Sequence, residues 1–266
     1  MQPLAVVDRV GTGVLGLFEF VGTLAVFGGR AVVEACRPPY ELREITRHLY
    51  QFGSRSAPLI LTAGFAIGIV LSMHTRATLQ RFGAEAMIPA GLALALVRET
   101  GPLTAGLLVS GRVGAGIGAE IGAMKVTEQI DALEANAVDA FKFLTVTRVI
   151  ACMIAMPLLT TLMNFAGIFG GYVAEAAISG MSWRLYFERA FTFIGFSDLI
   201  PATIKTIVFG YLIAVVGCYL GFNATRGTEG VGEASTRSVV MSSILIILSD
   251  VILVKIIFFF YPQVTG

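Results

Sequence analysis

Five stretches of the chain are long, apolar and poor in charge, which is the pattern of membrane-spanning helices. The hydrocarbon core of a bilayer is about 30 Å thick and needs about 20 apolar residues per helix. The stretches are residues 56–73, 86–123, 149–174, 199–222 and 239–261, and the third contains no charged residue. The pattern predicts an all-α integral membrane protein with five transmembrane helices.

The N-terminal stretch has a different pattern. Apolar residues recur at helical spacing from Val10 to Phe27, but charged residues break the run into pieces too short to span a bilayer comfortably. This pattern predicts an amphipathic helix lying in the membrane interface. A break is expected at Pro38-Pro39, followed by a second amphipathic piece over residues 40–52.

A cleaved signal peptide is the alternative interpretation of the N-terminal stretch. The acidic residues Asp8 and Glu19 fit poorly with the basic and then uninterrupted apolar regions of such a peptide. We therefore expect one domain over residues 1–266, with an interfacial region at 1–55 and a five-span bundle at 56–261.

Composition supports a membrane protein and excludes some functions. The chain has 266 residues, of which 56% are hydrophobic and 14% charged, whereas soluble domains carry about 25% charged residues. Its mean hydropathy is +0.80. The formal net charge of +1 is not concentrated in a basic cluster, so a nucleic-acid partner is not expected.

Basic residues in the loops predict the orientation of the chain. Eleven Lys and Arg residues lie on the side that holds the N-terminus, against four on the other side. The positive-inside rule then places the N-terminus in the cytoplasm, and five spans place the C-terminus in the periplasm. The N-terminus does not look like an organelle transit peptide, which favours a bacterial inner membrane.

No motif for catalysis or for binding a cofactor stands out. Cys36, Cys152 and Cys218 are far apart in sequence, and His48 and His74 are isolated, so neither a disulfide framework nor a metal site is expected. The chain also lacks a G-x-x-x-x-G-K-[ST] phosphate loop. We expect no enzyme activity and no cofactor in this chain, so ATP and Mg²⁺, if they drive its function, must bind another polypeptide.

Three glycines in the second stretch have the spacing of a helix-packing face. Gly114, Gly118 and Gly122 are four residues apart, so they lie on one side of a helix and let another helix approach closely. A dinucleotide-binding loop is the alternative, but no strand precedes these glycines.

Five of the charged residues inside the predicted spans need a partner or a purpose, because charge is costly there and usually functional. They are Arg98, Glu99, Glu120, Lys205 and Asp250. Arg98 and Glu99 point about 100° apart on a helix, so they are not expected to pair with each other. Lys205 and Asp250 are expected to form an ion pair between the last two spans, either as a structural contact or as an ion relay.

The loops between spans contain three further segments of interest. Residues 125–139 form a helix candidate with an apolar stripe and several carboxylates, either a solvated loop helix or a docking helix for a cytoplasmic partner. Residues 182–193 are aromatic and predict an interfacial helix on the outer side. Residues 223–236 contain three glycines and predict a flexible connection.

Several short motifs, in order, resemble the MlaE/YrbE permease family. They are Arg98-Glu99-Thr100-Gly101-Pro102, Gly111-Arg112-Val113-Gly114, Ala119-Glu120-Ile121-Gly122-Ala123-Met124, Thr127-Glu128-Gln129, Val138-Asp139 and Thr236-Arg237-Ser238-Val239-Val240. The resemblance covers nearly the whole chain. It implies the permease of an MCE-type ABC transporter for phospholipids, with an N-terminal interfacial elbow helix, five spans and a short cytoplasmic coupling helix between spans two and three.

The resemblance also implies partners and site residues. The partners are a second copy of the chain, a cytoplasmic ABC ATPase dimer and a periplasmic hexamer of MCE-domain proteins, and a separate STAS-domain protein is compatible with it. The implied ATPase-coupling residues are Glu128, Gln129, Asp131 and Leu133. The implied lipid-binding residues, in a chamber between two copies, are Leu71, Thr78, Leu79, Phe82, Arg98 and Glu99.

A mechanism is expected for the charged pair in that chamber. The guanidinium of Arg98 can bind a phosphate with two parallel hydrogen bonds, and Glu99 could orient Arg98 of the facing copy. The rival function is a secondary transporter or channel driven by an ion gradient through Lys205 and Asp250, and a membrane-embedded lipid-modifying enzyme is a third. ATP-independent transport by the isolated chain would favour the first rival, and a reactive cluster in the loops would favour the second.

Overall fold

The computed structural model describes residues 2–225 and 227–260, with the backbone alone for residues 2–15, 17 and 18, and every element in this part is helical. The predicted end of the fifth span at Tyr261 lies outside the described residues. The α-helices are α1 (Gln2–Ala35), α2 (Leu42–Leu79), α3 (Ile88–Ala95), α4 (Gly101–Val109), α5 (Ala115–Val126), α6 (Gln129–Ala135), α7 (Thr147–Ser179), α8 (Trp183–Phe191), α9 (Phe196–Phe222) and α10 (Gly227–Phe260).

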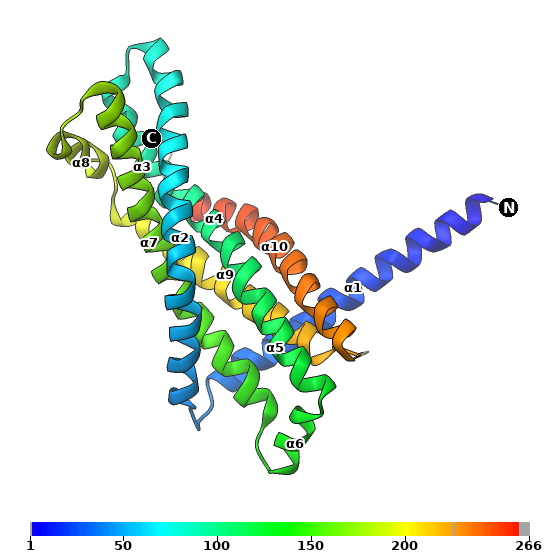
Figure 1. Ribbon diagram of the computed structural model, residues 1–266. Helices are drawn as coiled ribbons and strands as arrows, with labels where there is room; N and C mark the ends of the chain where they lie inside the picture. The colour runs from blue at the N-terminus through cyan, green and yellow to red at the C-terminus, as the bar shows by residue number, and fades with distance from the viewer. Residues whose placement is uncertain (1, 226, 261–266) are drawn as a thin grey trace.

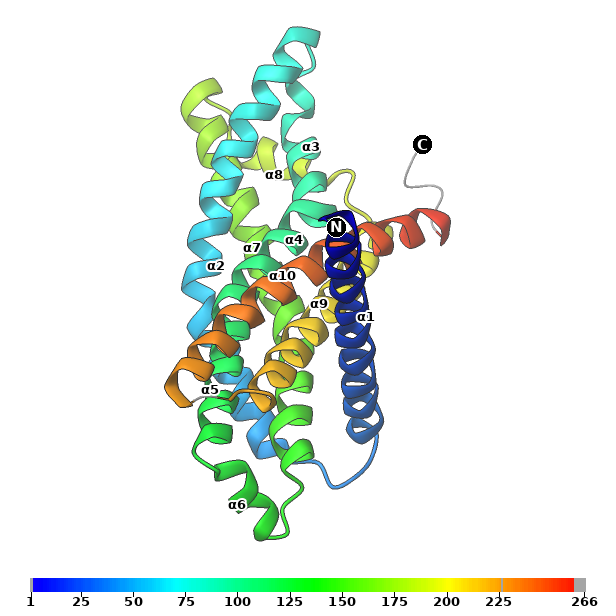
Figure 2. The ribbon, with the colours of Figure 1, turned by 90° about the vertical axis from the view of Figure 1, so that its right-hand side faces the viewer.

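Five helical units in the described part of the chain are long and apolar enough to cross a membrane, which confirms the predicted all-α membrane fold. They are Leu42–Phe82, Glu85–Val126, Lys142–Ser179, Phe196–Phe222 and Gly227–Phe260. The short helix α6 lies at one end of the bundle, and α8 lies toward the other (Figures 1 and 2). The N-terminal helix α1 is not among the five units, and its first half extends away from the bundle (Figure 1).

Two predicted boundaries are wrong. The amphipathic piece at residues 40–52 is not separate, because α2 continues from Leu42 through the whole first span. The connection predicted at residues 223–236 is mostly helical, because α10 begins at Gly227. The break at Pro38-Pro39 is present, between the end of α1 and the start of α2.

The second span is not a uniform α-helix. Its α-helical segments α3, α4 and α5 are joined by π-helical turns at Leu96–Thr100 and Ser110–Gly114. A π-helical turn inserts an extra residue into a helix and is common at functional sites. The first of these turns carries Arg98 and Glu99, so the local irregularity coincides with the charged pair singled out in the sequence.

Small residues bring the helices of the bundle into close contact. A β-carbon on Gly68 of α2 would overlap the carbonyl group of Gly167 on α7, and one on Gly118 of α5 would overlap Ser238 on α10. Gly122 also faces α10, where an added β-carbon would lie 3.6 Å from the Cα of Val231. The glycine spacing in the second span therefore corresponds to a tight α5–α10 contact, as in other membrane helix pairs.

Candidate functional site

A cavity of about 320 Å³ lies between the second span, α9 and α10. One wall carries the charged residues Arg98, Glu99, Asp198 and Lys205. The last turns of α10 contribute an apolar part of the lining, with Val254, Ile257 and Phe258. The cavity thus combines charge and apolar surface within the membrane-spanning part of the chain.

Arg98 is held in place by Asp198. The Nε of Arg98 donates a hydrogen bond of 2.7 Å to Oδ1 of Asp198, which is buried. The second oxygen of Asp198 accepts the backbone N–H of Gly195 at 3.0 Å. Asp198 also lies in the first turn of α9, where the helix dipole stabilises a negative charge. Asp198 is therefore fixed at the start of α9, and its hydrogen bond orients the Nε edge of the Arg98 guanidinium toward α9.

Lys205 is the centre of a second group of charges. Its Nζ lies 2.7 Å from Glu99 Oε2 and 2.7 Å from Asp250 Oδ1, and its side chain is 1% exposed. The contact with Asp250 joins the last two spans, as the sequence suggested. The contact with Glu99 adds the second span, so one buried ammonium group connects three membrane helices.

Arg98 and Glu99 each contact a charged side chain of the same chain. Both partners, Asp198 and Lys205, lie on α9, in line with the angular separation of the two neighbours. Glu99 accepts a hydrogen bond from Lys205 of its own chain, and its expected role in orienting Arg98 of a facing copy stays a prediction. Arg98 likewise finds its carboxylate partner, Asp198, within the same chain.

The other expected lipid-binding residues lie elsewhere. Leu71, Thr78 and Leu79 belong to the end of α2, and Phe82 lies in the turn that follows. None of the four lines the charged cavity. Thr78 is exposed, and Phe82 is 78% exposed, so these side chains face away from the single chain's core.

The expected coupling segment is a shorter helix than predicted. Lys125 still belongs to α5, and α6 covers only Gln129–Ala135. Glu128 is not inside the helix but precedes it in a left-handed conformation, with φ of 58°. Gln129 and Asp131 are exposed, and Asp131 lies 3.3 Å from Lys125. Leu133 packs against the hydrophobic core, so it connects α6 to the bundle.

Sequence reasoning missed two buried carboxylates. Asp198 of the charged cavity and Glu175 of α7 each lie one residue outside a predicted span, because those spans were drawn to end at charge. Glu175 is fully buried and accepts hydrogen bonds from Ser72 at 2.9 Å and from Arg76 at 3.2 Å. Both could have been found by a search for carboxylates that directly flank an apolar stretch, since the sequence alone assigned no carboxylate of the same chain to Arg76 or Arg98.

The described residues contain no group of three or more His, Cys, Asp and Glu side chains arranged to hold a metal ion. The charged residues of the cavity instead pair with one another and with Asp250 of α10, which is not among the lining residues. Three carboxylates and two basic groups come together, and each carboxylate has a basic group within 3 Å.

Comparison with known proteins decides the family. The family described as Permease MlaE matches residues 45–256. The chain belongs to the MlaE permease family. This places it among membrane permeases, which are transporter subunits and not enzymes, and its five apolar helices agree with a multi-pass inner-membrane protein.

Individual relatives agree along most of the chain. A probable ABC transporter permease protein of Rickettsia typhi is 38% identical over 255 residues, covering 96% of this chain and 98% of that protein. The intermembrane phospholipid transport system permease protein MlaE of Haemophilus influenzae is 31% identical, covering 95% and 97%. The chloroplastic protein TRIGALACTOSYLDIACYLGLYCEROL 1 of Arabidopsis thaliana is 30% identical, covering 89% and 67%.

Proposed function

We propose that this MlaE permease moves phospholipid between the inner membrane and a periplasmic assembly of MCE-domain proteins. It acts as a homodimer, and a cytoplasmic ABC ATPase dimer supplies the energy by binding ATP and Mg²⁺. The printed name of the Haemophilus influenzae relative, a phospholipid transport permease, supports the choice of cargo. The names of the Rickettsia relatives support the ABC class.

The observation that carries this proposal is the charged cavity. A phospholipid needs basic groups for its phosphate and apolar surface for its acyl chains. Arg98 and Lys205 supply the basic groups, and the end of α10 supplies the apolar wall. Few charged residues are tolerated inside membrane spans without such a purpose.

The ion pairs suggest how the affinity for lipid changes during transport. In the structure, Lys205 contacts the carboxylates of Glu99 and Asp250, and Arg98 contacts that of Asp198. A lipid phosphate must compete with these carboxylates, so it binds well only when the three helices separate enough to weaken the pairs. A movement of α9 or α10 therefore switches the cavity between states of high and low lipid affinity.

The α6 segment would transmit the movement from the ATPase. Glu128, Gln129 and Asp131 are exposed and can meet basic residues of a partner. Leu133 packs on the core, so a push on α6 reaches the bundle. In this arrangement the α6 end and the N-terminus are cytoplasmic, and the α8 end and the C-terminus are periplasmic.

The exposed end of α2 would complete the lipid path in the homodimer. Thr78 and Phe82 are exposed and would contact lipid at the surface that a second copy covers, whereas Leu71 packs against the buried cluster beside α3 and α8. The alternative is an ion relay through Lys205 and Asp250. Within the described residues, the ion pairs of Lys205 reach only Asp250 and Glu99, so they do not support this alternative.

The test is lipid transfer in liposomes that contain the permease, the ATPase and the MCE-domain partner. Arg98→Gln should lower ATP-dependent transfer of labelled phospholipid by about tenfold or more, because a charge-assisted phosphate contact is lost. Lys255→Gln is the control, because Lys255 lies exposed on α10 outside the charged cavity. Equal loss in both variants, or normal transfer by Arg98→Gln, would contradict the assignment of the cavity.

A further inference from the structure

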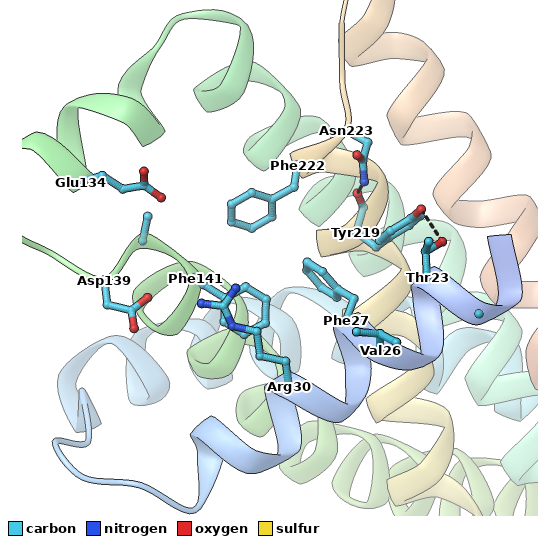
Figure 3. A pocket seen from close by; sticks show the side chains of 12 residues that line it. Thr23, Val26, Phe27, Arg30, Glu134, Asp139, Phe141, Tyr219, Phe222 and Asn223 are labelled. Carbon is cyan, nitrogen blue, oxygen red and sulfur yellow. Dashed lines mark hydrogen bonds between the residues drawn. The ribbon is translucent and has the colours of Figure 1, made fainter. Parts of the chain in front are cut away.

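A second and larger pocket, of about 770 Å³, lies at the α6 end of the molecule. Its walls come from the second half of α1, from α6 and the loop after it, and from the last turn of α9 (Figure 3). It shares no lining residue with the charged cavity. The volume is within the range of about 300 to 1,000 Å³ that is typical of small-molecule sites.

Aromatic rings form the inner wall of this pocket. The rings of Phe27 and Phe141 lie 5.0 Å apart, and those of Phe27 and Tyr219 lie 5.6 Å apart, both edge to face. Phe222 closes the wall beside them (Figure 3). The hydroxyl groups of Tyr219 and Thr23 share a hydrogen bond of 2.9 Å, which ties α9 to α1 at one edge. The wall is therefore apolar and well fixed.

A basic group stands at the edge of the aromatic wall. The guanidinium carbon of Arg30 lies 4.1 Å from the centre of the Phe141 ring (Figure 3). Within the described part of the chain, no carboxylate forms an ion pair with Arg30. Stacking on a ring orients a guanidinium and leaves its N–H groups directed outward, which suits a phosphate.

Two acidic groups face the same pocket. Glu134 comes from α6 and Asp139 from the loop that follows; in Figure 3 both lie to the left of the aromatic rings, with Asp139 on the side of Phe141 and Arg30. Among the described residues, neither carboxylate forms an ion pair, although Asp139 accepts the backbone N–H of Lys142 at 3.0 Å. Carboxylates beside aromatic rings form a favourable environment for an ammonium group.

The pocket thus offers one cation and two anions around an apolar wall. A ligand that matches it carries a phosphate and an ammonium group a few bonds apart, with an apolar body. We propose that the pocket binds the headgroup of an aminophospholipid of the phosphatidylethanolamine type, taken from the membrane leaflet beside α1. Arg30 binds the phosphate, Glu134 and Asp139 bind the ammonium group, and the first acyl carbons lie against Phe27 and Tyr219.

This site is distinct from the transport cavity and does not depend on the proposed function. Its walls join α1 to α6, so a bound lipid connects the N-terminal helix to the segment proposed to meet the ATPase. The chemistry also selects among lipids. Phosphatidylglycerol offers the phosphate without the ammonium group, and it therefore satisfies only Arg30.

Photo-crosslinking tests the site in nanodiscs that contain the permease with its co-purifying subunits. The probes are phosphatidylethanolamine and phosphatidylglycerol, each with a photoreactive group in the acyl chain near the glycerol, and labelled peptides are identified by mass spectrometry. Phosphatidylethanolamine should label residues 22–30 and 219–223 about tenfold more than phosphatidylglycerol does, as expected for an added charge-assisted contact.

Two variants separate the roles of the charges. Arg30→Gln should reduce labelling at the pocket by both lipids, whereas Glu134→Gln combined with Asp139→Asn should remove only the preference for phosphatidylethanolamine. All three residues are exposed, so folding is retained, and Arg43→Gln, an exposed arginine outside the pocket, is the control.

Other outcomes would overturn the proposal. Unchanged labelling in Arg30→Gln would show that the phosphate does not bind there. Equal labelling by the two lipids would exclude recognition of the ammonium group. Full competition by soluble glycerophosphoethanolamine at the concentration of the lipid would show that the pocket takes a free headgroup and not a membrane lipid.

Discussion

The charged cavity and the α6 segment both gather acidic and basic side chains, yet they use charge differently. In the cavity, Lys205 is 1% exposed and contacts two carboxylates from two other spans. At the other end, Asp131 is 59% exposed and its contact with Lys125 is longer, at 3.3 Å. Buried pairs fix the relative positions of helices, whereas exposed pairs contribute little to stability and remain available to a partner.

The comparison predicts its largest effect at Lys205. Lys205→Met removes the only basic group that contacts Asp250 among the described residues, and it leaves Glu99 and Asp250 without their partner. Removing one member of a buried pair costs about 3 to 5 kcal/mol. We expect a large fall in the yield of folded protein and in its thermal midpoint, both measured by size-exclusion chromatography in mild detergent.

Two matched variants make the Lys205 result interpretable. Lys255→Met removes an exposed lysine from α10 and should leave the thermal midpoint nearly unchanged. Lys205→Met combined with Asp250→Asn should recover part of the loss, because the substitution removes one of the unpaired charges. A Lys205→Met protein as stable as the unmodified chain would show that the three helices are positioned by packing alone.

The next largest effect is expected where packing, not charge, positions the helices. Gly68→Ala adds a β-carbon that would overlap the backbone of Gly167, so α2 and α7 must separate. Overpacking of this kind costs about 1 to 3 kcal/mol. Thermal unfolding measures the loss, and Gly53→Ala is the control, because Gly53 lies on the same helix with nothing within 4 Å of an added β-carbon.

The control Gly53→Ala has an expected effect on stability of its own. Alanine is favoured over glycine in a helix by about 1 kcal/mol, so Gly53→Ala should not destabilise the protein. Equal destabilisation by Gly53→Ala and Gly68→Ala would contradict the role of the close α2–α7 contact. The pair of variants therefore separates helix propensity from helix packing.

The five spans could be predicted because their apolar length is dictated by the bilayer. The extent of the helices could not, since helical backbone continues where hydropathy ends. Residues 42–55 of α2 carry exposed charges and still belong to the same helix. The start of α10 is rich in glycine, which resembles a loop, but Ala234 and Val231 pack closely against glycines of α5, and this contact offsets the low helix propensity.

The charged site could be predicted only in part. Lys205, Asp250, Arg98 and Glu99 stood out because each is a charge within an apolar stretch. The contacts of Glu99 with Lys205 and of Arg98 with Asp198 could not be predicted, because distances between spans cannot be read from a sequence. Asp198 was missed since it lies at the first turn of α9, outside the apolar stretch, although its carboxylate reaches Arg98 at 2.7 Å.

The smallest effect on stability, and the clearest effect on assembly, is expected at the α6 end. Glu128→Lys reverses an exposed charge that has no ion pair within the described residues, so the thermal midpoint should change by the equivalent of less than about 0.5 kcal/mol. Co-purification with the ATPase should fall, because like charges now meet across the proposed contact. Glu188→Lys on α8 is the control, since it makes the same change at the opposite end of the bundle. If Glu128→Lys still co-purified fully with the ATPase, the exposed charge of Glu128 would have no part in docking. The exposed charges of the α6 end and the buried pairs of the cavity would then differ only in how much they stabilise the protein.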